Sequence, residues 1–468
     1  MPHWFAMAGS SDHAVPAQDG RSFRKEVPRG SHGDWTPSPT RPDPVDLIEG
    51  QNEDRLSSMV PVRRVRMAES PFTFYRGAAR IMAHDLSQTP STALEVQLCG
   101  DAHLSNFGTF ASPERDLLFD LNDFDETLPG PWEWDAKRLA ASFVIAAKDL
   151  GFDEDDGREL AEDSVRSYRE VMQKFAGRAW LETWYSRFSL DDLADRAQQE
   201  NVKKKRRKQL EKFLRGAKKK DHLRAARKLV EHENGRLRLR SDPPLLVPLR
   251  NMPVVVDNEQ IEKAIYESFA GYRRSLSDEV GHLLDRYQVV DLALKVVGVG
   301  SVGTRCFVAL LVGRGQEDIL LLQVKEAGTS VLEEHLMPSR YSLSGQRVVE
   351  GQRLMQAASD IFLGWSEGTY TGSHYYWRQL KDWKASISFA DADGEGMGRY
   401  ARVCGWTLAR AHAVSGDPAA IASYLGSSTN FELALGEFAV RYARQNELDY
   451  EAFVTEIRDG RLEAAELE

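Results

Sequence analysis

A glycine-rich turn between two apolar segments is the feature that most limits how this chain can fold. Residues 295–327 read KVVGVGSVGTRCFVALLVGRGQEDILLLQVKEA, where Gly298, Gly300 and Gly303 have the spacing GxGxxG. Dinucleotide-binding folds contain the same string, but there the third glycine opens a helix. Here β-branched and apolar residues follow the glycines, and then come a second turn and another apolar segment. This order predicts a β-meander whose first turn closes over phosphate groups.

A second informative segment is the loop GDAHLSNFG, which follows an apolar, strand-like stretch and carries Asp101 and Asn106. Phosphoryl transfer needs a carboxylate that accepts the proton of the attacking hydroxyl, and an oxygen ligand for magnesium nearby. The next strand-like stretch, DLLFDLNDFDE at 116–126, ends with Asp123 and Asp125. Magnesium prefers hard oxygen ligands, although acidic clusters also occur in turns and helix caps. We expect Asp101 to be a catalytic base and Asn106, Asp123 and Asp125 to hold magnesium.

The composition is that of a large globular protein. The 468 residues are 42% hydrophobic, which is enough for two or three domains. A net charge of −10 argues against general binding to nucleic acids or membrane surfaces. The basic runs KKKRRK at 203–208 and KKK at 218–220 predict a solvated helical face, with a nucleic acid or acidic partner as the alternative.

Cysteine usage and the lack of long apolar runs bear on location. Cys99, Cys306 and Cys404 do not have the spacing of a zinc site, and so few cysteines are typical of a reducing compartment. No apolar run approaches the roughly 20 residues that span a bilayer. The first residues lack the pattern of a secretory signal. These observations predict a cytoplasmic protein with no membrane partner.

Shifts in composition divide the chain into four parts. Residues 1–45 are rich in Gly, Ser, Pro, Asp and His, and we expect them to form a disordered tail. Residues 46–285 are expected to form helices around the two acidic segments, together with a charged helical insert. Residues 286–385 are expected to form the β-rich unit, and residues 386–468 are expected to form further helices.

Six stretches spread along the chain carry a family resemblance: FYRGAARIM, GDAHLSNFG, FDLNDFDETLPGPWEWDAKRLAAS, KVVGVGSVGTRC, VVEGQRLMQAASD and LARAHAVSGD. Together they resemble the bacterial family called domain of unknown function 2252. The resemblance covers most of the chain from about residue 45 onwards. It implies that these stretches belong to one unit, and it implies no substrate.

A second resemblance points to the chemistry. GDAHLSN is similar to the GDxHxxN loop of aminoglycoside and choline phosphotransferases, and Asp-Phe-Asp at 123–125 is similar to the kinase DFG segment. Gly100 stands where protein kinases have arginine, which favours a small-molecule or atypical acceptor. The resemblance implies that Lys325 reaches the α- and β-phosphates of ATP. It also implies that a carboxylate on the next helix pairs with this lysine. We expect Glu350, with Glu333 and Glu334 as alternatives.

The same resemblance implies where the nucleotide lies. The segment 376–384 would be a hinge whose backbone meets the adenine, and the glycine turn would cover the phosphates. Asp135 resembles the buried aspartate that braces kinase catalytic loops, with a surface or cap residue as the alternative. The expected cofactor-binding residues are Gly298, Gly300, Ser301, Gly303, Lys325 and Gln379.

The order of these parts is reversed relative to protein kinases. The catalytic and metal segments precede the glycine turn, and YARVCGWTLARAHAV at 400–414 resembles the helix that leads into a kinase catalytic loop. Circular permutation moves the chain ends and keeps the core contacts. The resemblance therefore implies an α+β, two-lobed, protein-kinase-like fold that is circularly permuted. Its helical large lobe would be encoded at both ends of the chain, and its β-rich small lobe in the middle.

The expected function is that of an ATP- and magnesium-dependent phosphotransferase acting on an unknown, small-molecule hydroxyl. A regulatory pseudokinase that binds nucleotide, or a nucleotidyl transferase on the same fold, is the alternative. A dinucleotide-dependent oxidoreductase is the third class, which the strand after the glycines disfavours. The expected partners are the nucleotide and the acceptor, and a nucleic acid is not expected.

Overall fold

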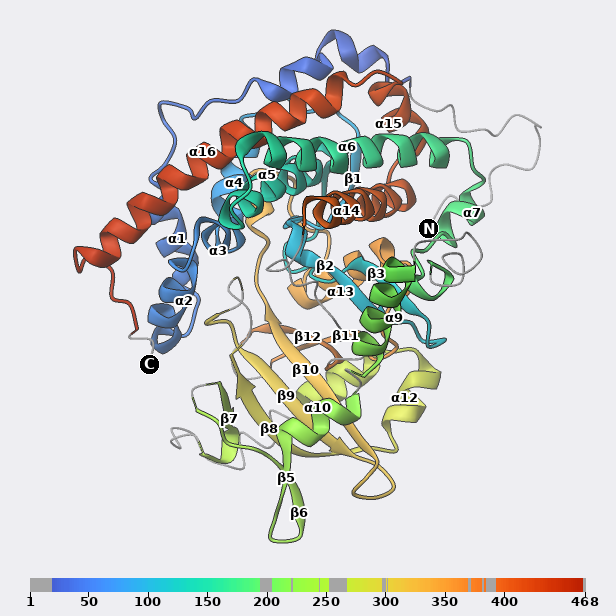
Figure 1. The fold of residues 1–468 in the computed structure, drawn as a ribbon. Coiled ribbons are helices and arrows are strands. Elements are labelled where there is room, and N and C mark those ends of the chain that lie inside the picture. The colour runs from blue at the N-terminus through green and yellow to red at the C-terminus, as the bar shows by residue number, and fades with distance from the viewer. Residues whose placement is uncertain are drawn as a thin grey trace.

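The computed structural model describes residues 19–193, 204–219, 222–243, 245–251, 267–296, 300, 302–368, 372–380, 383 and 393–465. Helices and strands are mixed along this part of the chain, which confirms the α+β class. Figure 1 shows the long helices α5, α6, α14 and α16 at the top and an antiparallel sheet at the bottom. We call these two regions the helical part and the sheet part.

The sheet part is built on a sheet that has six strands within the described residues, in the order β11-β12-β10-β9-β8-β7, and each pair is antiparallel. In this register Lys325 lies opposite Cys306 on one side and Tyr376 on the other. The strands are β7 (Leu246–Pro248), β8 (Gln288–Lys295), β9 (Cys306–Val312), β10 (Ile319–Ala327), β11 (Gly364–Glu367) and β12 (His374–Gln379).

Both faces of this sheet are covered, which explains the nearly continuous apolar run of β9. Val308 and Leu310 pack towards α10 (His222–Leu229) and the hairpin of β5 (Val230–Glu233) and β6 (Arg236–Leu239). Ala309 and Leu311 point to the opposite face and pack near α12 (Asp278–Leu284). Successive side chains of a strand alternate between faces, so a strand that is buried on both sides has no polar alternation.

The predicted start of the β-rich unit at residue 286 is too late. The strand β7 pairs with β8, and the side chains of Val230, Leu237 and Leu246 share one apolar cluster with the sheet. Residues that sequence composition grouped with the helical insert therefore belong to the sheet part. Their high charge hid this, because only one side of each short strand is buried.

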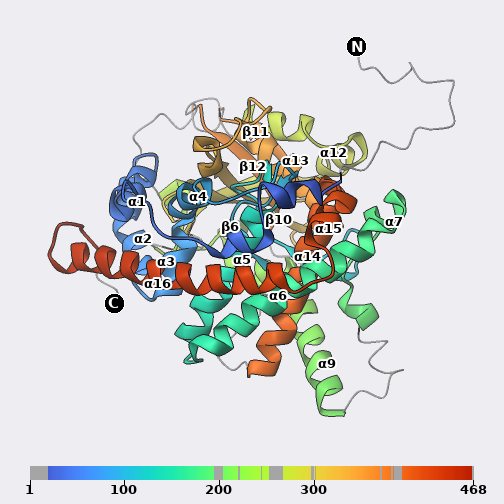
Figure 2. The ribbon, with the colours of Figure 1, turned by 90° about the horizontal axis from the view of Figure 1, so that it is seen from above.

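The helical part is organised around two buried helices. Helix α5 (Glu133–Asp149) is buried along almost its whole length, as expected for a helix that is apolar on most sides. Helix α14 (Gly394–Ser415) packs closely on α6 (Glu154–Ala176) at Gly405, where a Cβ atom would lie 2.0 Å from the carbonyl oxygen of Ser164. Figure 2 shows α16 (Asn430–Arg458) lying along α5 and α6.

Part of the predicted N-terminal tail is folded. Residues 19–45 contain two 3-10 turns, Ser22–Lys25 and Arg29–Gly33, which lie against α15 (Pro418–Leu425) and α16. Trp35 is buried there against aromatic rings of α16. The expectation of disorder is wrong for these residues, because a few apolar side chains dock on a surface built by the C-terminal helices. Residues 1–18 lie outside the described residues.

The remaining elements connect these parts. Residues 71–87 form two helices that are separated at Ala78. No helix among the described residues is long and apolar enough to cross a membrane. The other helices and strands are α1 (Pro44–Asn52), α2 (Val60–Met67), α3 (Pro71–Gly77), α4 (Ala79–Ser87), β1 (Glu95–Leu98), β2 (Phe107–Ala111), β3 (Leu117–Leu121), β4 (Leu128–Pro131), α7 (Trp180–Trp184), α9 (Lys204–Lys218) and α13 (Ser344–Met355).

Candidate functional site

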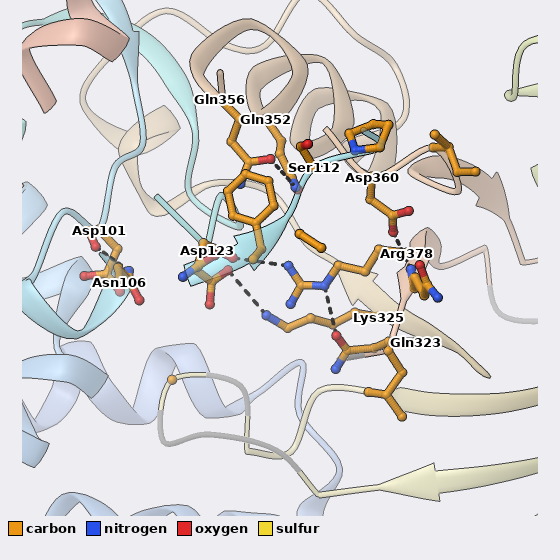
Figure 3. A pocket seen from close by; sticks show the side chains of 18 of the residues that line it. Asp101, Asn106, Ser112, Asp123, Gln323, Lys325, Gln352, Gln356, Asp360 and Arg378 are labelled. Carbon is orange, nitrogen blue, oxygen red and sulfur yellow. Dashed lines mark hydrogen bonds and ion pairs between the residues drawn. The ribbon is translucent and has the colours of Figure 1, made fainter. Parts of the chain in front are cut away.

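A pocket of about 500 Å³ lies where the helical part meets the sheet part. This volume is sufficient for a small ligand. Figure 3 shows Asp101 and Asn106 together on one side of the pocket, with Lys325 reaching towards Asp123 from the sheet. The side chains that matter below are Arg76, Asp101, Asn106, Asp123, Gln323, Lys325, Gln352, Gln356, Asp360, Arg378 and Gln379.

The buried carboxylate of Asp135 holds the loop that carries Asp101 in place. Asp135, at the start of α5, accepts hydrogen bonds from the backbone nitrogens of Cys99 (2.7 Å) and Gly100 (3.0 Å). Its Oδ2 atom also lies 3.3 Å from Nε2 of His412 on α14. Gly100 has φ +81°, and a Cβ atom there would lie 2.4 Å from the carbonyl oxygen of Glu126. Asp135 is thus a buried brace and not a surface or cap residue.

Removing this brace is expected to destabilise the protein. Asp135→Ala would leave two buried backbone donors without an acceptor, which should lower the free energy of unfolding by about 3 kcal/mol. Urea denaturation followed by circular dichroism measures the change. The control is Asp155→Ala, at an exposed position in the first turn of α6, which should stay within about 0.5 kcal/mol of the wild type. Equal midpoints for both variants would contradict the role of Asp135.

Asp101 is oriented by a buried arginine. Nε of Arg138 donates to Oδ1 of Asp101 at 2.6 Å, and Nε2 of His103 lies 3.6 Å from Oδ2. Burial raises the pKa of Asp101, and the charge of Arg138 opposes this without cancelling it. The side chain keeps a fifth of its surface exposed, on the pocket side. The carboxylate is therefore fixed in direction and still accessible to a small molecule.

Asn106 and Asp123 are linked through the backbone. The side-chain nitrogen of Asn106 donates to the carbonyl oxygen of Asp101 at 2.5 Å, which closes the loop. The backbone nitrogen of Asn122 donates to the carbonyl oxygen of Asn106 at 2.8 Å. This bond places Asp123 beside the loop, and the Asp123 side chain is 36% exposed. A carboxylate and an amide oxygen thus line the same wall of the pocket.

Lys325 enters the pocket from β10 and is almost fully buried. Its Nζ atom bonds to the carboxylate of Asp125 and lies 3.6 Å from Oδ1 of Asp123. Burial lowers the pKa of Lys325, but the two carboxylates outweigh it and hold the pKa well above its usual value. The hydroxyl of Tyr376 donates to the other oxygen of Asp125 at 2.8 Å. Asp125, predicted to be a metal ligand, therefore has both oxygens engaged by Lys325 and Tyr376.

The predicted pairing of Lys325 with Glu350 is wrong. Glu350 bonds to Arg353 on its own helix at 3.2 Å and lines a separate cleft. Towards the pocket, α13 presents Gln352 and Gln356 instead. Residues two positions apart point to nearly opposite sides of a helix, so a carboxylate at 350 faces away when position 352 faces in.

The two alternative partners are also engaged elsewhere. Glu333 lies 3.7 Å from Arg347, and its side chain caps a 3-10 turn at Ser330. Glu334 pairs with Arg80 at 2.8 Å. Among the described residues, the carboxylates that contact Lys325 come from the acidic segment after β3, and none comes from the helix after β10.

The glycine turn joins β8 to β9, which form an antiparallel pair, and the described residues after Gly303 lead into β9 and not into a helix. Gly298 and Ser301 lie outside the described residues. Gly300 lines the pocket, and Gly303 has φ +89°, which favours glycine. The backbone nitrogen of Leu56 donates to the carbonyl oxygen of Gly303 at 2.8 Å. The turn is thus anchored by the segment between α1 and α2.

The predicted hinge lies at the far end of the pocket. Gln379 lines the pocket, but its backbone nitrogen donates to the carboxylate of Asp360. Nε of Arg378 donates to Oε1 of Gln323 at 2.9 Å, as Figure 3 shows. Charged and amide side chains therefore line the end of the pocket where the adenine was expected. Residues 381–382 and 384 lie outside the described residues.

Helix α14 ends beside the strand that leads into the Asp101 loop. The backbone nitrogen of Gln97 in β1 donates to Oγ of Ser415, the last residue of α14, at 3.1 Å. The hydroxyl of Tyr400 donates to the carbonyl oxygen of Leu104 at 2.7 Å. The helix predicted at 400–414 therefore packs along residues 95–106, although about 300 positions separate them.

A family model confirms the first resemblance. The model described as "Uncharacterized protein conserved in bacteria (DUF2252)" matches residues 55–456. The chain belongs to the DUF2252 family. No curated protein matches the chain, and no solved structure does. The matched region contains every pocket side chain named above, so the pocket is built entirely by the DUF2252 region.

Sequence reasoning missed several polar residues of this DUF2252 pocket. Arg76 comes from the helical part, and Gln323 and Arg378 come from the sheet. Arg138, also from the helical part, does not line the pocket but bonds to Asp101. Two of them stand inside family stretches, Arg76 in FYRGAARIM and Arg138 in FDLNDFDETLPGPWEWDAKRLAAS. That position was the available signal.

The donor set of the pocket fits a magnesium ion that is shared with a nucleotide. Among the described residues, no three His, Cys, Asp or Glu side chains group together as a metal site. Asn106 and Asp123 offer one amide oxygen and one carboxylate on the same pocket wall. Magnesium is usually held by one or two carboxylates together with substrate phosphates and water. The two side chains therefore fit the role of a partial site that phosphates complete.

Proposed function

We propose that the chain is an ATP- and magnesium-dependent phosphotransferase whose kinase-like, two-lobed fold is circularly permuted. The observation that carries the proposal is the meeting of Asp101, Asp123 and Lys325 in one pocket. Asp101 and Asp123 come from the helical part, and Lys325 comes from β10 in the sheet part. Phosphoryl transfer depends on positioning and charge stabilisation, so these groups are useful only when they share a cleft.

The order of elements in the sheet part supports the kinase-like assignment. A glycine turn joins β8 and β9, β10 carries the lysine, α13 follows, and β11 and β12 complete the sheet. Protein kinases have a glycine-rich loop, then a lysine on the third strand, and then a helix. In this chain α14 ends next to β1, which leads into the Asp101 loop. Cutting a kinase between those two elements and joining the old ends produces this order.

The chain's own residues would then take the following roles. Asp101 accepts the proton of the acceptor hydroxyl, whose oxygen forms a bond to the γ-phosphorus of ATP. The bond between this phosphorus and the β–γ bridging oxygen breaks, and ADP leaves. Lys325 binds the α- and β-phosphates. Asn106 and Asp123 would hold magnesium, which neutralises phosphate charge when it is bound.

The second aspartate of the Asp-Phe-Asp segment gives this site a character of its own. Kinases have glycine at that position and draw the partner of the lysine from a helix. Here Asp125 contacts Lys325, and α13 contributes glutamines to the pocket. We propose that Asp125 performs the orienting role of the helix glutamate. The lysine is then oriented from the helical part of the chain.

The proposal is tested by calorimetry with ATP and magnesium and by transfer of label from γ-labelled ATP to a panel of cell metabolites. Wild-type protein is expected to bind Mg-ATP, and Asp123→Asn should weaken this binding about tenfold or more, because one carboxylate of the magnesium site is lost. Melting temperatures establish that the variant is folded. NAD, titrated in parallel, should not bind.

The outcomes separate the candidate functions. Magnesium-dependent binding without transfer to any acceptor, and without hydrolysis, would favour the regulatory nucleotide-binding protein. Transfer of label from the α-phosphate instead of the γ-phosphate would favour the nucleotidyl transferase. Equal affinity of the wild type and a folded Asp123→Asn variant for Mg-ATP would remove the metal assignment.

A further inference from the structure

Arg76 is a half-buried cation at the wall of the pocket. It lies near the end of α3 and lines both the main pocket and a smaller recess beside it. Its Nε atom is buried and has no hydrogen-bond partner among the described residues. An unpaired polar atom in a protein interior costs free energy, so such an atom at a pocket wall indicates a missing ligand.

The nearest carboxylates do not satisfy this guanidinium. Asp101 is bonded to Arg138, and Asp123 lies within ion-pair distance of Lys325. Both carboxylates are close enough to act on the charge of Arg76, since they oppose the lowering of its pKa by burial. Arg76 therefore lies beside Asp101 and Asp123, the base and the metal ligand of the proposed reaction. Its Nε atom is still able to donate a hydrogen bond to a ligand.

The recess defines which part of a ligand Arg76 would meet. Arg76, Asp101 and Asp123 line it together with Gly300 of the glycine turn. A Cβ atom on Gly300 would lie 3.5 Å from the backbone oxygen of Arg76, so Gly300 lies close to the end of α3. The space lies between the catalytic loop and the phosphate-binding turn. A terminal phosphate of a nucleotide under that turn would point into it.

We propose that Arg76 contacts the phosphoryl group while it passes from ATP to the acceptor. The inference rests on the proposed phosphotransferase function and adds a catalytic residue to it. In the transition state, negative charge spreads over the three equatorial oxygens of the transferred group. A planar guanidinium with several donors matches such oxygens, and an arginine supplied in cis performs this task in other phosphoryl-transfer enzymes.

The chemical step remains balanced with Arg76 in this position. The acceptor oxygen forms a bond to the γ-phosphorus, and the bond from that phosphorus to the bridging oxygen breaks. Asp101 takes the acceptor proton, and ADP carries the leaving electron pair. Arg76 neither gains nor loses a proton. It binds the oxygens of the transferred group, and it does so best when the charge on them is most widely spread.

The test uses the full chain without an identified acceptor, so that water serves as the acceptor. The variants are Arg76→Gln and Arg76→Lys, with Arg80→Gln as the control. Arg80 lies one turn further along, on α4, and pairs with Glu334 outside the pocket. The rate of ATP hydrolysis should fall about 10³-fold in Arg76→Gln and stay unchanged in Arg80→Gln. Affinity for Mg-ADP should change less than about threefold, because ADP lacks the transferred group.

A second measurement distinguishes catalysis from folding. Calorimetry with Mg-ADP plus aluminium fluoride mimics the transferred group, and the wild type should bind this mixture more tightly than Mg-ADP alone. Arg76→Gln should lose this gain. Arg76→Lys keeps the charge and should retain only part of it. If Arg76→Gln keeps both the hydrolysis rate and the gain, Arg76 does not contact the transferred group. A wild-type protein without any ATP turnover or binding would refute the proposed function itself, and this inference with it.

Discussion

Asp101→Asn is expected to lower kcat for phosphoryl transfer about 10²- to 10⁴-fold, which is the usual contribution of a positioned general base. The amide retains an oxygen that can accept the hydrogen bond from Arg138, so the loop should keep its shape. It cannot accept the proton of the acceptor hydroxyl at neutral pH. Steady-state kinetics with γ-labelled ATP measures kcat, and calorimetry should show nearly unchanged affinity for Mg-ATP.

The control for this variant is Asp116→Asn. Asp116 also forms an ion pair with an arginine, Arg187, at 2.8 Å, but it lies at the surface just before β3. This exchange should leave kcat within about twofold of the wild type, because surface ion pairs contribute little. A folded Asp101→Asn protein with full kcat would show that another group takes the proton.

Lys325→Met is expected to produce the second large effect, a loss of about 10²- to 10³-fold in kcat, as is typical when one preorganised charge donor is removed. Methionine fills a similar space on β10 but offers no contact to phosphates. It also leaves Asp123 and Asp125 side by side without their shared cation. We therefore expect a lower melting temperature together with weaker binding of ATP.

Two further variants separate the role of Lys325 from that of its partners. Glu350→Gln should leave kcat unchanged, because Glu350 contacts Arg353 on the far side of α13. Asp125→Asn should reduce kcat, because Lys325 loses the carboxylate that orients it. Lys148→Met replaces an exposed lysine that pairs with Glu447, and it is the control for the replacement of a lysine by methionine in Lys325→Met. If Glu350→Gln lost its kcat and Asp125→Asn kept it, Glu350 and not Asp125 would be the carboxylate that orients Lys325.

Local patterns in the sequence were sufficient for most of the elements that frame the pocket. The glycine turn followed by β-branched residues predicted the antiparallel strands β8, β9 and β10 correctly. The apolar segment before GDAHLSN predicted β1. These predictions succeeded because backbone geometry and side-chain periodicity act over a few residues.

Partners across the pocket were beyond such reasoning. The pairing of Lys325 with Asp125 joins residues that are 200 positions apart, and nothing local marks either as the other's partner. The choice of Glu350 followed a template in which the helix supplies the carboxylate. The rotation of α13 about its axis decided otherwise, and packing against the sheet and β1 sets that rotation. The same holds for Arg76, whose neighbours in the recess come from the Asp101 loop and from Gly300 in the turn before β9.

The sequence by itself determined the class of the fold, the family, and the three groups Asp101, Asp123 and Lys325 that now share one pocket. Each of these depends on short strings whose chemistry is carried by the residues themselves. Only the tertiary structure decided which carboxylate holds the lysine, that Nε of Arg76 is left without a partner among the described residues at the pocket wall, and that residues 19–45 dock on the C-terminal helices. Such choices depend on the packing of segments that are remote in the chain, because burial and distance set the energy of a charge.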